Sequence, residues 1–203
     1  MKDLLSLLSS TLDDNAVGEI SQQIEATPQQ TRGAINAALP MLMGMMANNC
    51  QSKQGCESLA NAVNRDHAGG GVLQQAQAFL RQGNIGGGEK ILGHILGSRL
   101  GTAESQLAGQ TGLQSGQTHK LLGFLAPIVL GALGQQAQAQ GGATPSTIQN
   151  LLQGSLSSLM QGQGGQVGSQ ILGSLLGGQG GQGNGSGGLA AAGGKLLGGL
   201  FKK

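Results

Sequence analysis

Apolar residues recur at intervals of three and four along most of this chain. Residues at that spacing share one face of an α-helix. The sequence opens with two such stripes, formed by Leu4, Leu5, Leu8 and Leu12 and then by Val17, Ile20 and Ile24. The pattern therefore predicts two short amphipathic helices before residue 25.

A longer helix is predicted to begin at Thr27-Pro28. Threonine is a favoured N-cap, proline fits the first helical position, and Gln30 completes a capping-box pattern. The apolar pattern continues through Pro40 towards Asn48-Asn49. Proline lacks an amide donor and crowds the preceding turn, so we expect the helix to bend or break at Pro40.

The same pattern returns 87 residues later. Residues 30–44 (QTRGAINAALPMLMG) align without a gap with residues 117–131 (QTHKLLGFLAPIVLG). Pro40 thereby corresponds to Pro127. Self-similarity at a long period is typical of a duplicated packing unit. We predict an all-α domain over residues 1–140, with two copies of a multihelical unit built on Pro-bent helices, at about 1–50 and 88–137.

Further helices are expected between and within these copies. Two shorter ones, at 56–64 and 72–81, should bridge the copies, and a glycine-rich break at 83–88 should follow them. The second copy is predicted to hold helices at about 89–100, 103–110 and 116–138.

The character of the chain changes beyond Gly141. Thr144-Pro145 again favours a helix start, and an apolar face follows it, made of Ile148, Leu151, Leu152, Leu156 and Leu159. Residues 169–176 are similar to residues 90–96. Residues 177–188 are Gly, Gln, Asn and Ser, a composition typical of flexible linkers. We predict that 141–203 is a weakly ordered, low-complexity Gly/Gln-rich tail with helical islands.

Composition narrows the classes of function. The 203 residues include 40 glycines, three phenylalanines and no Trp or Tyr, so any core must be aliphatic. All nine acidic residues precede residue 105, and only Lys120, Lys195, Lys202 and Lys203 are charged after it. So few positive charges form no basic patch, and aromatic stacking platforms are absent, which argues against nucleic-acid binding.

The search for targeting signals and the spacing of the two cysteines bear on the cellular compartment of the protein. The apolar run Leu4–Leu8 is too short for a signal peptide, and no stretch approaches the roughly 18 apolar residues of a membrane-spanning helix. We therefore expect a cytoplasmic protein. Cys50 and Cys56 have C-x5-C spacing, which fits neither a C-x2-C redox pair nor a zinc site. We expect two reduced thiols at a helix end; a small disulfide loop is the alternative if the chain is exported.

Two segments of the second copy carry a family resemblance. They are Gly87–Gly97 (GGEKILGHILG) and Leu121–Gly131 (LLGFLAPIVLG). Together they resemble the bacterial domain of unknown function 937 family and the related YidB-like helical proteins. The resemblance is good over residues 86–134 and weaker over 1–85. It implies an all-helical fold and a bacterial source, and it transfers no catalytic residue.

Candidate catalytic and metal-binding residues are sparse. We interpret His94 as a structural histidine on a semi-apolar helix face, and His119, which aligns with Arg32, as a surface residue. Asp66-His67 lacks the second histidine of a zinc motif, although a folded site could still gather Cys50, Cys56 and His67. No G-x-S-x-G elbow occurs. We predict no catalytic, cofactor-binding or metal site, and hence no enzyme.

The end of the chain offers a contact surface instead. A short cationic amphipathic segment is formed by Lys195, Leu196, Leu197, Leu200, Phe201, Lys202 and Lys203. Such a segment is similar to interfacial membrane helices, and it could equally dock on the domain itself. Our leading hypothesis is a non-catalytic helical scaffold or protein-interaction module, with a protein partner or self-association. The alternative is a peripheral membrane protein that makes weak membrane-surface contact through this segment. Neither hypothesis specifies a small-molecule ligand.

Overall fold

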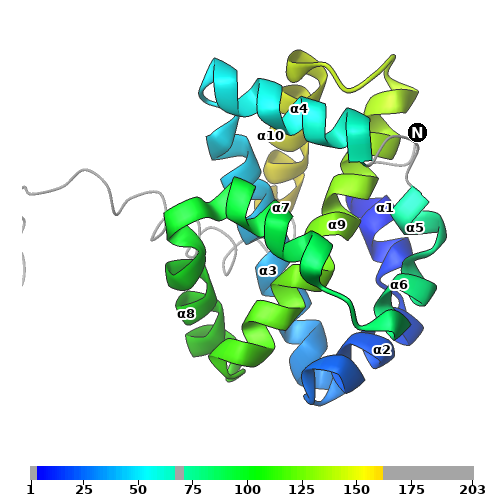
Figure 1. Cartoon of the computed structure of the whole chain (residues 1–203), viewed down its shortest axis with the longest axis vertical. Coiled ribbons are helices and arrows are strands. Elements are labelled where there is room, and N and C mark those ends of the chain that lie inside the picture. The colour runs from blue at the N-terminus through cyan, green and yellow to red at the C-terminus, as the bar shows by residue number, and fades with distance from the viewer. Residues whose placement is uncertain (1–3, 67–70, 162–203) are drawn as a thin grey trace, which may run out of the picture.

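The computed structural model describes residues 4–66 and 71–161, and every regular element in these ranges is a helix (Figure 1). The prediction of an all-α fold is confirmed. The helices are α1 (Leu4–Thr11), α2 (Asp14–Ile24), α3 (Pro28–Asn49), α4 (Lys53–Asp66), α5 (Gly71–Gln74), α6 (Ala76–Gln82), α7 (Gly86–Leu96), α8 (Leu100–Thr111), α9 (Ser115–Ala139) and α10 (Pro145–Gln161), with a 3-10 turn, η2 (Gly97–Arg99), between α7 and α8.

Two long helices, α3 and α9, form the centre of the molecule and pack against each other. Every residue of α9 from Leu121 to Gly134 is buried, and so is every residue of α3 from Met41 to Met46. Figure 1 shows α9 running through the middle, with α8 on one side and α1, α2 and α6 on the other. Among the described helices, α9 alone has the length and composition of a membrane span, but 83% of its most apolar window is buried. Its apolar character is therefore explained by the core.

Both long helices begin as their sequences favour. The side chain of Thr27 accepts a hydrogen bond from the amide of Gln30 (3.2 Å), and the Gln30 side chain accepts one from the Thr27 amide (3.2 Å), which confirms the predicted capping box. At the start of α9, the Gln117 side chain accepts a hydrogen bond from the Gln114 amide (2.8 Å). These bonds satisfy donors that a helix start otherwise leaves free.

Neither internal proline ends its helix. Pro40 lies inside α3 and Pro127 inside α9, and both are buried. A proline in a helix interior removes one backbone hydrogen bond, at a cost of about 3 kcal/mol or more. Dense packing around both prolines offsets this cost, because most helical stability in proteins comes from tertiary contacts.

The peripheral helices pack on both central helices. Helix α2 contacts α3 and also α9, whereas α8 contacts α9 and also α3. Helix α10 packs against α3, α4 and α9, and its residues Ile148 and Leu152 are fully buried. The packed body of the molecule therefore extends past the predicted boundary at residue 141. Residues 162–203, which include the predicted linker 177–188, lie outside the described residues.

Some predicted helix boundaries differ from the structure. The bridging segment 72–81 is not one helix, because a turn at Gln75 separates α5 from α6. The helix predicted at 89–100 ends at Leu96, where Gly97 takes a positive φ of 50°. The glycine-rich segment 83–88 was expected to be a break, yet α7 already begins at Gly86.

A close crossing of α7 and α9 explains why part of the glycine-rich segment lies inside α7. A Cβ atom at Gly88 would lie 1.8 Å from the backbone oxygen of Gly123. Glycine at this position therefore serves helix–helix contact. A glycine that permits close backbone approach and one that breaks a helix look the same in a sequence.

We expect Gly88→Ala to lower the free energy of unfolding by about 1–3 kcal/mol, because the added methyl group forces the two helices apart. The matched control is Gly93→Ala in the same helix, where a Cβ would meet nothing within 4 Å. That change should raise the free energy of unfolding by about 0.5–1 kcal/mol, the usual gain from removing a helical glycine. Urea denaturation followed by circular dichroism measures both. Equal effects of the two substitutions would contradict the close crossing.

Candidate functional site

A groove lies between α1, the C-terminal end of α9 and α10. Its volume is about 610 Å³. The residues that line it are Leu4, Leu5, Leu7, Gln135, Gln136, Ala139, Gln140, Asn150, Leu151, Gly154, Ser155 and Ser158. Four leucines give it an apolar floor, whereas side-chain amides and hydroxyls supply its polar groups. None of these lining residues is ionisable.

This lining determines which ligands the groove suits. An apolar floor with polar groups beside it favours an aliphatic surface that also offers hydrogen-bonding groups. Acid–base and nucleophilic catalysis need a titratable or activated group, and the lining residues supply none. The groups that line the groove can bind a ligand through apolar contacts and hydrogen bonds.

A cluster of titratable side chains lies elsewhere, where α7, α8 and α9 meet. The Nδ1 atom of His119 lies 2.6 Å from Oε1 of Glu104, and its Nε2 atom lies 3.0 Å from Oε1 of Glu89. The hydrogen bond with Glu104, and then that with Glu89, raises the pKa of His119 above its ordinary value of 6.5, although burial opposes the shift. A charged imidazole can donate to both carboxylates at once. The cluster thus links three helices while His119 is protonated.

In this cluster, the His119 ring bridges two carboxylates from different helices. The two carboxylates lie on opposite nitrogens of one ring, so they do not converge with the ring on a common point. Within residues 4–66 and 71–161, no three His, Cys, Asp or Glu side chains are grouped to hold a metal ion.

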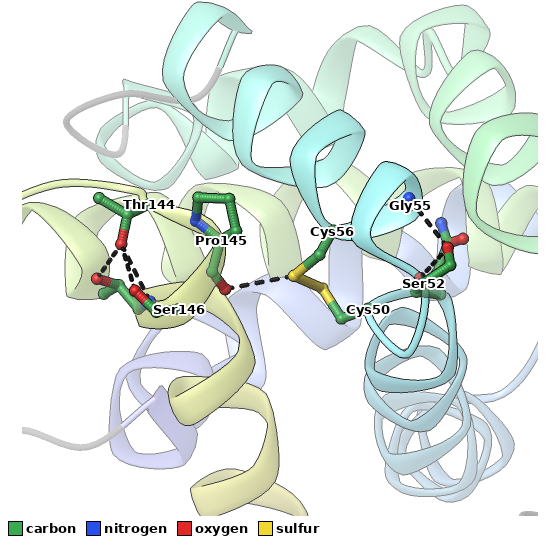
Figure 2. The surroundings of a disulfide bond; sticks show 9 residues. Cys50, Ser52, Gly55, Cys56, Thr144, Pro145 and Ser146 are labelled. Carbon is green, nitrogen blue, oxygen red and sulfur yellow. Dashed lines mark hydrogen bonds between the residues drawn. A yellow bond between two sulfur atoms is a disulfide. The ribbon is translucent and has the colours of Figure 1, made fainter.

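The two cysteines form a disulfide, so the prediction of two reduced thiols is wrong. Cys50 follows the last residue of α3, and Cys56 lies in the first turn of α4 (Figure 2). The short turn between these helices brings the two residues together, with their Cα atoms 4.0 Å apart. Both residues are buried, and Sγ of Cys56 lies 3.3 Å from the backbone oxygen of Pro145 at the start of α10. The disulfide therefore lies at the junction of α3, α4 and α10.

A family model described as a bacterial protein of unknown function (DUF937) matches residues 6–136. The chain belongs to this family. The match runs from α1 to near the end of α9, so it includes the central helices and the His119 cluster but stops before α10. No curated protein and no solved structure matches the chain. Membership in the DUF937 family confirms the resemblance found in the sequence.

The structure locates some of the residues singled out in the sequence. His94 is exposed near the C-terminal end of α7, so it is not a packed structural residue. His119 is partly exposed, as its alignment with Arg32 suggested, but its two carboxylate partners were missed. Glu104 and Glu89 are 15 and 30 residues away in sequence.

Other residues singled out in the sequence lie outside the described part of the chain. His67, the proposed neighbour of Cys50 and Cys56, is one of them. The cationic segment also lies outside them, with all of its residues: Lys195, Leu196, Leu197, Leu200, Phe201, Lys202 and Lys203. The groove itself was not predicted, because it depends on how α10 packs on α1 and α9.

We expect the stability of this DUF937 protein to fall as pH rises through the pKa of folded His119. A raised pKa in the folded state means that the cluster contributes its full stabilisation below the unfolded value of about 6.5 and loses it above the folded value. Urea denaturation between about pH 5 and pH 9 measures this dependence. His119→Gln should remove this part of the pH dependence, whereas His94→Gln should keep it. A His119→Gln profile identical to that of the parent protein would contradict the assignment.

Proposed function

We propose that this protein is a non-catalytic helical scaffold and protein-interaction module whose groove between α1, α9 and α10 binds a segment of a partner protein. The groove is the observation that carries the proposal. Its leucine floor and neutral polar groups suit the apolar face of a helix, which is a common mode of protein recognition. A partner helix would place its apolar side chains over Leu5, Leu7 and Leu151.

The walls of the groove are held by the core. Ile148 and Leu152 anchor α10, and Leu4 and Leu8 anchor α1, all with at most 2% of their surface exposed. The α9 wall extends a helix whose preceding turns are fully buried. A preformed site binds with a smaller loss of conformational entropy than one that must be ordered. This arrangement supports a binding role for the groove.

We also propose that the fold is a duplicated unit. Pro28 begins α3 and Ser115, 87 residues later, begins α9. At the same offset, Glu25 and Gly112 both end a helix in the left-handed conformation, with φ of 57° and 70°. Glu25 is the sole non-glycine residue with positive φ in the described chain, so its match with a glycine is informative.

Packing between the two halves supports the duplication as well. The 87-residue offset pairs α2 with α8, α3 with α9 and α4 with α10. Helix α2 contacts α9, and its counterpart α8 contacts α3. In the same way, α4 contacts α9, and its counterpart α10 contacts α3. Reciprocal contacts of this kind are those of a two-fold symmetric dimer. The repeated unit would then extend beyond the bent helices to include α4 and α10.

The disulfide bears on where the protein works. Disulfides persist in oxidising compartments such as the bacterial periplasm and are rare in the cytosol. We therefore propose an oxidising compartment in place of the cytoplasmic location expected from the sequence. Alkylation of free thiols in intact cells before lysis should leave Cys50 and Cys56 unmodified. Alkylation of both residues in most of the protein would instead support the cytoplasmic location.

Site-specific photo-crosslinking in intact cells tests the interaction role. Gly154 lines the groove, and a Cβ there would meet nothing within 4 Å, so a crosslinking amino acid should not disturb the fold. Gly109 on α8 is equally open and lies outside the groove, which makes it the matched control. We expect position 154 to give a discrete adduct with another protein chain and position 109 to give none. If the two positions give the same adducts, the groove is not the interaction site.

A further inference from the structure

We propose that residues 169–176 of this chain occupy the groove between α1, α9 and α10 in the free protein, so that a partner must displace them. This inference rests on the proposed function, since it assigns the groove a resident segment in cis. It makes the groove a regulated interaction surface.

The position of the segment supports this assignment. Helix α10 forms one wall of the groove from Asn150 to Ser158 and ends at Gln161. The chain continues from there with residues 162–168, which are mostly Gly and Gln, before the apolar segment begins. Seven residues span up to about 25 Å, whereas the α10 wall is only about 12 Å long. The chain is therefore long enough for residues 169–176 to fold back along the groove.

A related sequence already packs on α9 within this structure. Residues 169–176 (SQILGSLL) are similar to residues 90–96 (KILGHIL), which belong to α7. In α7, Leu92 and Leu96 are buried and the helix packs on α9. The corresponding residues, Leu172 and Leu176, have the same helical spacing. In this fold, a segment with this pattern thus packs on a neighbouring helix through its leucines, and the groove offers such a neighbour in α1, α9 and α10.

Residues 169–176 differ in charge from the cationic segment 195–203, which also contains apolar residues. The groove lining has no ionisable residue, and residues 162–194 have none either. The cationic segment 195–203 carries Lys195, Lys202 and Lys203, and the groove has no carboxylate to pair with them. Placing a charge on a neutral, partly apolar surface without a partner is costly. The neutral segment 169–176 is therefore the better occupant.

Single tryptophan reporters test the assignment in the full-length protein. The chain has no Trp and no Tyr, so an introduced tryptophan is the sole source of its emission. We expect the emission of Leu175→Trp to be blue-shifted relative to that of Leu197→Trp, and this shift to be independent of protein concentration. Adding Gly154→Glu should abolish the shift, because it puts a charge into the groove. Gly154 is an exposed helical position with open space at Cβ, so this change should preserve the fold.

Amide exchange gives a second readout without a bulky reporter. In the parent protein, Asn150–Ser158 should exchange more slowly than in an Ile171→Asp, Leu175→Asp variant, while a Leu196→Asp, Leu200→Asp variant should match the parent. Emission that is equally red for both reporters, or a blue shift that survives Gly154→Glu, would overturn the assignment. Neither result would affect the adduct that photo-crosslinking detects between Gly154 and another protein, so the two proposals fail separately.

Discussion

The packing of α3 against α9 is the contact on which the rest of this structure depends. Fourteen successive residues of α9, from Leu121 to Gly134, are buried, which requires neighbours on every side of that helix. A helix that is apolar all round is stable in water only when other helices cover it. Helices α1, α2, α4, α5, α7, α8 and α10 provide that cover. The groove is therefore a consequence of how the core is enclosed.

A core built almost wholly from aliphatic side chains requires the helices to pack close together. Among the described residues, one aromatic pair is present, Phe79 and Phe124, whose rings meet edge to face with centroids 6.1 Å apart. Elsewhere, small residues let backbones approach closely, as where Gly88 lies against Gly123. At Gly131, a Cβ would come within 3.4 Å of the Leu73 side chain. Short separations increase the number of dispersion contacts per residue, which compensates for the lack of large side chains.

Most charged contacts between helices lie at the surface of the described chain. Arg32 on α3 pairs with Asp14 on α2, and His119, at the matching place on α9, pairs with Glu104 on α8. Exposed pairs of this kind contribute little to stability, typically below about 1 kcal/mol. The His119 cluster differs because its contribution depends on pH.

Local sequence determined the helices themselves. The 3.6-residue periodicity, the Thr27–Gln30 capping box and the Thr144-Pro145 start all act over one or two turns, and the structure contains each of them. The alignment of residues 30–44 with 117–131 likewise identified the two long central helices. Family membership was also readable from the sequence, because it rests on the packing motifs of those same helices.

Tertiary structure decided the features on which the proposed function rests. Whether Gly88 breaks a helix or permits a crossing depends on Gly123, which is 35 residues away. The pairing of Cys50 with Cys56 required a tight turn between α3 and α4 that C-x5-C spacing alone does not specify. The partners of His119 and the groove beside α10 come from helices distant in sequence. Periodicity and capping report only interactions within a few residues, whereas these features arise when separate helices meet.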